Sequence, residues 1–454
     1  MENKKILIKN GWVLPLNSKD IFFEKGYISI LGDQICEIGC GDPSITLEIN
    51  ANEVIDATNM VVMPGMVNAH THLFQTFTRG FADDKPLMKW LSDYIWPIGS
   101  LMTAYEARLS GLLGIVENIR SGVTSIIDNQ YIHSHPGIDD AYCNAALEMG
   151  VRYILARGWT DTGSLPPGFT ESQKEIIDQV GDLVTRWNDH PSGRIRVNFG
   201  PQAINPCSKE TFILTNQYAK RWGIGTHLHI AESKYQLEKN IKANGFREVE
   251  WLDHLNCLDE KTRLVHSIWL SDEEIELIVR KNAKVVHCPI SNMYLADGVA
   301  RIPEMMEKGI VIALGTDGPG SNNNQDMFEV LKATALLHKI TTMNASVLQP
   351  IDVIWMACRG GAEAFGQPDL IGSLEVGKKA DIILVDMDTS FAVPVYYPPS
   401  ALVYNLNASA VDTVMVGGNF LMRDKTILGI DEKKLLEECR NAARNLISRA
   451  GVIL

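Results

Sequence analysis

Short apolar runs alternate with amphipathic stretches along most of the chain. Stretches with helical periodicity, such as EIIDQVGDLVTRW and DEEIELIVRK, separate most of these runs. Strands that alternate with helices in this way favour a parallel sheet, and eight such units are typical of a (β/α)8 barrel. The pattern therefore predicts an α/β fold with a TIM-like barrel over residues 61–370. The eight runs are VVMPGMVNAH, VTSIID, VRYILAR, RIRVNFG, IGTHLHIA, RLVHS, KVVHC and IVIALGTD.

The two ends of the chain show a different pattern. Residues 1–60 contain short alternating segments broken by Gly, Asn and Asp, which predict strands and turns. Strand-like segments return after about residue 370 as ADIILVD and VDTVMVGG, and KKLLEECRNAARNLISRA has the period of an amphipathic helix. We therefore expect residues 1–60 and 371–454 to combine into one small β-sandwich domain with a C-terminal helix.

Composition and charge narrow the class of protein. The 42 Lys and Arg against 55 Asp and Glu give a net charge of −13, which excludes nucleic acid as the default partner. No apolar run reaches the roughly 18 residues of a membrane-spanning helix, and the first residues lack the apolar core of an export signal. The eight cysteines are scattered without a CxxC pair, which favours reduced thiols. We expect a cytoplasmic protein that binds neither nucleic acid nor membrane.

Histidines gather where the predicted barrel strands end, which is where the active sites of such barrels lie. In His70-Thr71-His72 the two imidazoles share one face of a strand and can point at one metal ion, although such a pair also fits a structural role. Three imidazoles and one carboxylate suit zinc, with a position left for water, and iron or manganese would also be tolerated. The strand-end residues are His70, His72, His227, His229, His266, His287 and Asp317.

Five motifs resemble those of the amidohydrolase superfamily: PGMVNAHTH, HLHIAES, LVHSIWL, VVHCPISN and LGTDGPGSNN. The segment IGSLEVGKKADIILVD is similar to the one by which that family re-enters its small β-domain, so the resemblance covers nearly the whole chain. More narrowly, the chain resembles the branch (ATZ/TRZ-like) of cytosine, guanine and methylthioadenosine/S-adenosylhomocysteine deaminases and triazine hydrolases. The run RVNFGPQA lacks a lysine that could be carbamylated, so the resemblance implies one divalent metal ion. It implies that the metal ligands are His70, His72, His229 and Asp317.

The resemblance also implies catalytic roles for Glu232, His266 and Asp317. A metal of this kind makes hydroxide available at neutral pH to attack an electron-poor carbon. Glu232 would move the water proton to a ring nitrogen, Asp317 would pass a proton to the departing ammonia, and His266 would hold the new hydroxyl. Glu232 could instead be a solvated loop carboxylate. We expect a zinc-dependent hydrolase that acts on non-peptide C–N bonds of cyclic amidines.

The segment after the first barrel strand is similar to the helical lid of that branch. Trp90 in this lid can cover a flat ring by stacking, whereas Trp96 is expected in the core. Two positions depart from the nucleoside deaminases: Ile98 follows the Trp-Pro pair where a Glu usually binds ribose, and Gln202 stands where a His is common. Their absence favours a free heterocycle, because a ribose site would leave its polar groups unpaired with a bare ring.

Other positions near the predicted strand ends are candidates for substrate binding. Gln202 could contact the amide edge of the ring, and Arg157 could contact a carbonyl or carboxylate of the substrate or form a salt bridge. His287 could orient the substrate or pack under the metal site. Ser291 and Asn292 are expected to bond the local backbone and hold their loop.

The sequence therefore favours a hydrolytic deaminase of an amino-substituted purine, pterin, pyrimidine or triazine. The alternatives are a methylthioadenosine/S-adenosylhomocysteine deaminase, or a triazine hydrolase that expels chloride or an alkylamine. A non-catalytic scaffold is a third class, and the presence of all four ligand positions argues against it. The expected partner is a small heterocyclic substrate, and the family resemblance implies a homo-oligomer.

Overall fold

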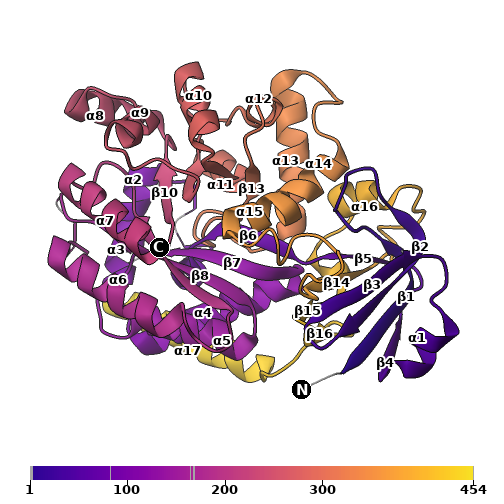
Figure 1. Cartoon of the computed structure of the whole chain (residues 1–454). Helices are drawn as coiled ribbons and strands as arrows, with labels where there is room; N and C mark the ends of the chain where they lie inside the picture. Colours follow the sequence, from indigo (N-terminus) through magenta and orange to yellow (C-terminus); the bar gives the residue numbers. More distant parts are fainter. Residues whose placement is uncertain (1–3, 82, 164, 167–168, 453–454) are drawn as a thin grey trace. The chain divides into compact units, whose positions relative to one another are not determined.

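The structure of the chain is a computed structural model that describes residues 4–81, 83–163, 165–166 and 169–452 (Figure 1). The chain forms two compact units. The first comprises Met1–Asn68, Val116–Ser125 and Asp326–Ile430, and the second comprises Ala69–Ile115, Ile126–Gln325 and Asp431–Leu454. The sequence-based division into 1–60 with 371–454 and 61–370 stays a prediction.

An eight-stranded sheet follows the chain order from β6 to β13. Neighbouring strands from β8 to β13 pair in parallel. The backbone N–H of Asp317, just after β13, donates to the carbonyl of His70 in β6 at 3.0 Å and so links the last strand to the first. This arrangement confirms the predicted (β/α)8 barrel. Its strands are β6 (Met66–Thr71), β7 (Val123–Gln130), β8 (Arg152–Trp159), β9 (Ile195–Pro201), β10 (Thr226–Ile230), β11 (Thr262–His266), β12 (Lys284–His287) and β13 (Ile312–Leu314).

Helices between the barrel strands begin at the residues that their sequences indicate. Ser172, Ser233 and Ser271 each accept from the backbone N–H three residues later, and the side chain at that third position bonds back to the serine N–H. These helices are α4 (Ala104–Arg120), α5 (Ile138–Met149), α6 (Gln173–Trp187), α7 (Lys209–Trp222), α8 (Lys234–Asn244), α9 (Glu248–His254), α10 (Asp272–Lys281), α11 (Pro289–Tyr294) and α12 (Ile302–Glu307).

Shorter helical segments follow β6, and further helices follow the barrel strands. After β6 come a 3₁₀ turn (Leu73–Thr78), α2 (Leu87–Trp90), a π turn (Leu91–Ile95) and α3 (Trp96–Gly99). Later elements are α13 (Met327–Thr342), α14 (Pro350–Trp355), a π turn (Met356–Gly360), α15 (Gly361–Phe365), α16 (Pro398–Tyr404), a 3₁₀ turn (Ala408–Ala410) and α17 (Glu432–Ala450). Within the described ranges, no helix is both long and apolar enough to cross a membrane.

A second, mixed sheet has nine strands and combines the two ends of the chain, as predicted. The antiparallel pairing of β5 with β14 joins residues that precede the barrel to residues that follow it. Ile6, Ile28, Val62, Ile382 and Met415 belong to its buried core. The strands are β1 (Lys5–Val13), β2 (Phe23–Leu31), β3 (Gln34–Cys40), β4 (Glu53–Asp56), β5 (Met60–Pro64), β14 (Ile382–Asp386), β15 (Val411–Val416), β16 (Asn419–Arg423) and β17 (Thr426–Ile427), with α1 (Ile45–Asn50) before β4. All eight cysteines are free thiols.

Candidate active site

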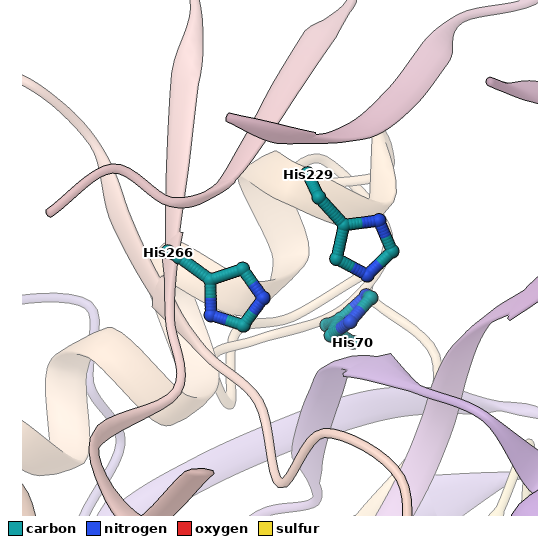
Figure 2. A group of neighbouring side chains, drawn as sticks. All are labelled: His70, His229 and His266. Carbon is teal, nitrogen blue, oxygen red and sulfur yellow. The ribbon is translucent and has the colours of Figure 1, made fainter. Parts of the chain in front are cut away.

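Four histidine rings from three barrel strands meet at the carboxyl ends of those strands. β6 carries His70 and leads into His72, while β10 carries His229 and β11 ends at His266. Ring centroids lie 4.7 Å apart for His70 and His72, 4.9 Å for His70 and His229, and 5.4 Å for His229 and His266. Figure 2 shows the rings of His70, His229 and His266 turned toward one another. The structure therefore brings together imidazoles that are far apart in the sequence.

Each of these rings is oriented by a polar contact at its Nδ1 atom. A ring whose Nδ1–H donates presents the lone pair of Nε2 on its other side. The Nε2 atoms of His72 and His229 lie 3.2 Å apart, which shows that these lone pairs converge. The Nδ1 contacts are His70 with His227 Nε2 at 2.8 Å, His72 with the Asn129 carbonyl at 2.6 Å, His229 with the Gln202 carbonyl at 2.6 Å, and His266 with Asn292 Oδ1 at 2.8 Å.

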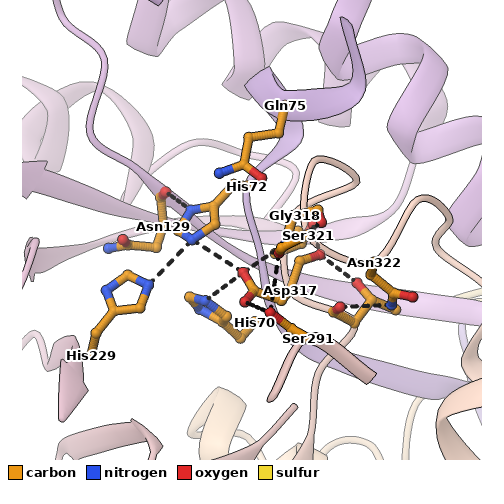
Figure 3. A network of polar contacts seen from close by, with 12 residues as sticks. His70, His72, Gln75, Asn129, His229, Ser291, Asp317, Gly318, Ser321 and Asn322 are labelled. Carbon is orange, nitrogen blue, oxygen red and sulfur yellow. Dashed lines mark hydrogen bonds and ion pairs between the residues drawn. The ribbon is translucent and has the colours of Figure 1, made fainter. Parts of the chain in front are cut away.

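Asp317 supplies a carboxylate to the same cluster (Figure 3). Its Oδ1 atom lies 3.3 Å from Nε2 of both His70 and His72. The Gly318 N–H donates to Oδ1 at 2.7 Å, and the Ser291 hydroxyl donates to Oδ2 at 2.7 Å. Burial raises the pKa of Asp317, but contact with His70 and the neighbouring imidazoles outweighs it and holds that pKa well below its usual range. Asp317 is therefore an ionised carboxylate at neutral pH.

The cluster has the chemistry of a divalent metal site. Burial lowers the pKa of His70 and His72, and it lowers that of His229 to about 4, so these rings are neutral at pH 7. Nε2 of His70 and Nε2 of His266 are buried, and neither has a hydrogen-bond partner in the described part of the chain. Neutral imidazoles with unused lone pairs beside a carboxylate are the donors that zinc and similar cations bind. Possible ligand atoms lie within 4.8 Å of one another in two groups: His70, His72 and Asp317, and His70, His229 and His266.

Glu232 lies beside this cluster, just after β10. Its Oε1 atom is 3.6 Å from Nε2 of His266, and its side chain is 8% exposed, so it is not a solvated loop carboxylate. Nε2 of His266 also lies 3.9 Å from Oδ2 of Asp317. A water molecule or substrate between these groups would meet two carboxylates and one imidazole, which is a set suited to proton transfer.

The backbone at these strand ends adopts an uncommon conformation. Ala231, His266 and Asp317 have positive φ values of 49°, 67° and 61°, in the left-handed region that non-glycine residues seldom occupy. Such strain persists where the surrounding structure enforces it, and it concentrates at functional sites. Three strand ends of the barrel are thus bent at the residues that form the cluster or precede Glu232.

A cavity of about 270 Å³ opens over the cluster and is lined by His72, His229, Glu232 and Asp317. Its volume is near the lower end of the roughly 300–1,000 Å³ typical of small-molecule sites. Two predicted substrate-binding residues, Trp90 and Gln202, line it. Trp96 was expected in the core, but it is only half-buried and also lines the cavity.

The other two predicted substrate-binding residues lie outside the described lining of this cavity. The Arg157 side chain is fully buried, with Nη1 2.5 Å and Nη2 2.7 Å from the Glu171 carboxylate and Nε 3.5 Å from Asp139. This geometry matches the salt-bridge alternative for Arg157, and its contact with substrate stays a prediction. His287 ends β12 and is fully buried, which fits packing beneath the cluster.

Some residues of the site differ from the sequence-based expectation or were missed by it. The side chains of Ser291 and Asn292 bond Asp317 and His266, where bonds to the local backbone were expected. Gln75 and Tyr131 line the cavity and were not singled out from the sequence. Tyr131 directly follows β7, and this position at the carboxyl end of a barrel strand was the signal that could have identified it.

Comparisons with known proteins agree with this geometry. A 5'-deoxyadenosine deaminase from Methanosarcina mazei is 37% identical over 446 residues, which cover 98% of this chain and 99% of that protein. A 5-methylthioadenosine/S-adenosylhomocysteine deaminase from Thermoanaerobacter pseudethanolicus is 35% identical over 98% of this chain and 100% of that protein. The crystal structure of an adenosine deaminase from Xanthomonas campestris with bound zinc superposes with a TM-score of 0.91 at 28% identity, over 98% of both chains. Residues 61–421 match the amidohydrolase family, and the chain belongs to that family.

Proposed function

We propose that this protein is a metal-dependent hydrolytic deaminase of an amino-substituted N-heterocycle. The observation that carries the proposal is the buried cluster of His70, His72, His229 and Asp317, in which Nε2 of His72 lies 3.2 Å from Nε2 of His229 and 3.3 Å from Oδ1 of Asp317. These four residues would hold one zinc ion, because three imidazoles and a carboxylate suit that metal. The zinc of the related adenosine deaminase supports this choice over Fe²⁺ or Mn²⁺.

When bound, zinc acts as a Lewis acid and lowers the pKa of water toward ~7. Glu232 then accepts a proton from the attacking water and delivers it to the ring nitrogen beside the attacked carbon. Asp317 accepts the proton of the new hydroxyl and passes it to the departing ammonia, and Nε2 of His266 contacts the same oxygen from the side of Glu232. Their burial excludes bulk water from these transfers.

The described lining of the cavity supports a flat ring as the substrate. Trp90 can stack on a purine, pterin, pyrimidine or triazine, and the Gln202 side chain can contact its amide edge. Among the described lining residues, Glu232 and Asp317 are the only carboxylates. Ile98 is buried and is not part of this described lining. Without a further carboxylate for ribose hydroxyls, a free heterocycle is the better match.

A nucleoside deaminase is the second candidate, and the relatives favour it. Proteins named 5'-deoxyadenosine deaminase and 5-methylthioadenosine/S-adenosylhomocysteine deaminase match this chain over 98% of its length. Both candidates attack an amino-substituted ring with the same residues, so they differ only in what the outer part of the cavity accepts.

A screen for ammonia release from the zinc-loaded protein tests the proposal. The substrates are aminopurines, aminopterins, aminopyrimidines, aminotriazines, 5'-deoxyadenosine and methylthioadenosine, and chloride and alkylamine are measured in parallel to detect triazine hydrolysis. Glu232→Gln should lower turnover by about 10²- to 10⁴-fold, the contribution of one proton-transferring group. Glu238→Gln is the matched control, because Glu238 is an exposed carboxylate on α8.

Two outcomes would contradict the proposal in different ways. If the protein holds stoichiometric zinc and releases no ammonia from any of these compounds, the deaminase assignment is wrong. If Glu232→Gln retains full turnover, only the proton-transfer role of Glu232 is wrong.

The location and assembly of the protein are further proposals. We place it in the cytoplasm, as its free and unpaired cysteines favour a reducing compartment. We also propose a homo-oligomer, which light scattering after size-exclusion chromatography would test.

A further inference from the structure

Tyr131 is a buried phenol in the wall of the cavity. It is 5% exposed and directly follows β7, and its ring packs edge-on against His72 at 5.2 Å and against Phe74 at 5.0 Å. Burial raises the pKa of Tyr131, and the nearby charges of Asp317 and Glu232 raise it further. The hydroxyl therefore keeps its proton while it lies near the reacting centre.

Gln75 lies beside this hydroxyl and bonds its oxygen. Gln75 is 1% exposed and lines the same cavity, and its Nε2 atom donates to the Tyr131 oxygen at 3.4 Å. The amide packs against the loop after β13: a Cβ added to Gly318 would lie 1.9 Å from Oε1, and one added to Gly320 would lie 3.0 Å from it. The glycines thus leave room for an amide that is fixed in place beside Tyr131 (Figure 3 shows Gln75 near Gly318).

The oxygen of Tyr131 accepts from Gln75, but its proton has no acceptor in the described part of the chain. Gln75 Oε1 is also buried without a hydrogen-bond partner there. Buried polar groups are nearly always paired, so an orphan donor in a cavity wall indicates a partner that arrives with the ligand. Because Tyr131 lines the cavity, a bound ring can supply such an acceptor.

We propose that Tyr131 is a substrate-binding residue whose hydroxyl donates a hydrogen bond to a ring nitrogen of the heterocycle, and that Gln75 is the positioning residue that orients this hydroxyl. The inference rests on the proposed function and adds to it a rule of selectivity. The enzyme should favour rings that carry, besides the nitrogen protonated by Glu232, a second nitrogen acceptor facing Tyr131. A ring with C–H at that place would leave the Tyr131 hydroxyl proton without an acceptor.

The test combines a variant with ring analogues in the zinc-loaded protein. The probes are adenine and 5'-deoxyadenosine with their 3-deaza and 7-deaza counterparts, and guanine with its 7-deaza counterpart. In each counterpart, one ring nitrogen other than the one protonated by Glu232 is replaced by C–H. A parent of another ring class found by the screen is treated likewise. Tyr131→Phe should lower kcat/KM for the parent by about 10- to 100-fold, the factor expected for one buried hydrogen bond. For the deaza analogue that lacks the nitrogen facing Tyr131, the kcat/KM values of wild type and Tyr131→Phe should be equal within about twofold.

A binding measurement separates this role from an effect on the metal site. Dissociation constants of the same probes are measured in the Glu232→Gln background, with zinc content determined for each sample. Tyr131→Phe should weaken binding of the parent and leave binding of that analogue and the zinc content unchanged. Gln75→Leu should reproduce part of the loss, and the double variant should lose little more than Tyr131→Phe alone, because both act on one hydrogen bond.

Tyr142→Phe is the matched control. Tyr142 is also fully buried, but its hydroxyl bonds Ser110 and Met102 and lies outside the described lining of the cavity. The kcat/KM of Tyr142→Phe should equal that of wild type. If Tyr131→Phe lowers kcat/KM for the parent and every analogue by the same factor, or for none, the inference is wrong although the deaminase assignment holds. If wild type turns over no parent, the proposed function itself has failed.

Discussion

Replacement of Arg157 by Met would remove a buried cation from two carboxylates that remain in place. The guanidinium makes two contacts with Glu171, at 2.5 and 2.7 Å, and one with Asp139 at 3.5 Å. The carboxylate side chains are only 9% exposed for Glu171 and 14% exposed for Asp139. Loss of one partner of a buried ion pair costs about 3–5 kcal/mol, because the remaining charge is left without compensation. Arg157→Met should therefore lower the free energy of unfolding by about this amount.

The ion pair of Arg157 with Glu171 lies close to residues that line the cavity. The Glu171 N–H donates to the Thr160 carbonyl at 2.9 Å, and the Thr160 hydroxyl donates to the Phe169 carbonyl at 2.6 Å. These bonds close the base of the segment from which Thr162 and Leu165 line the cavity. We expect KM to rise more than kcat falls, because the loosened segment shapes the cavity and carries none of the proposed proton-transfer groups.

Urea unfolding of the zinc-loaded protein, with steady-state kinetics on the same samples, measures both effects. Lys174→Met on α6 is the matched control, because its ion pair with Asp178 is exposed, with side chains 84% and 59% accessible. Such surface pairs contribute about 0–1 kcal/mol. The double variant Arg157→Met/Glu171→Met should recover part of the stability, since Asp139 keeps His133 at 3.1 Å as a partner.

Two results would refute this reasoning. If Arg157→Met is as stable as Lys174→Met, the ion pairs of Arg157 do not hold the segment. If stability is unchanged but substrate binding is lost, Arg157 contacts the substrate, as the first sequence-based alternative for this residue states.

Three further substitutions test the orientation of the site and the effect of burial. His227→Phe removes the partner of His70 Nδ1 at 2.8 Å, so zinc affinity measured by chelator competition should fall about 10- to 100-fold, and an unchanged affinity would contradict this role. Ser291→Ala removes the hydrogen bond to Asp317 Oδ2 at 2.7 Å and should lower kcat/KM about 10-fold at unchanged zinc content, whereas wild-type kcat/KM would show that this bond is dispensable. Burial raises the pKa of Asp128 to about 7, so the folded protein holds a proton that the unfolded chain releases near pH ~4, and stability falls as pH rises between these values. Asp128→Asn lacks this dependence, so the urea midpoint of the variant minus that of wild type should increase from pH 4 to pH 7. If this difference stays constant over that range, the pKa of Asp128 is not raised.

Much of the fold and part of the site could be predicted from local patterns. The run VTSIID coincides with β7, RLVHS with β11 and KVVHC with β12, because strand period and β-branched residues act over a few neighbours. Strand-end histidines could be identified in the same way, since the carboxyl ends of barrel strands meet at one face. The capping box of Ser271 and Glu274 also depends only on residues that are close in the sequence.

Contacts between distant residues could not be predicted from such patterns. His227 reaches His70 across 157 residues, Gln75 reaches Tyr131 across 56, and Ser291 reaches Asp317 across 26. Each contact depends on the register between strands and on the path of a loop, and hydrophobic periodicity contains no information about either. The location of Trp96 could not be predicted either, because its large apolar ring is typical of a core residue but lines the cavity.

The sequence by itself determined the order of strands and helices and the donor atoms available for a metal. These properties depend on residue type and on spacing over one or two turns. Only the tertiary structure decided which nitrogen of each imidazole faces the cluster, that Arg157 is paired with carboxylates, and that Tyr131 keeps an unpaired donor in the cavity wall. The physical reason is that a hydrogen bond requires two groups within about 3 Å in a fixed orientation, which only the packed barrel provides.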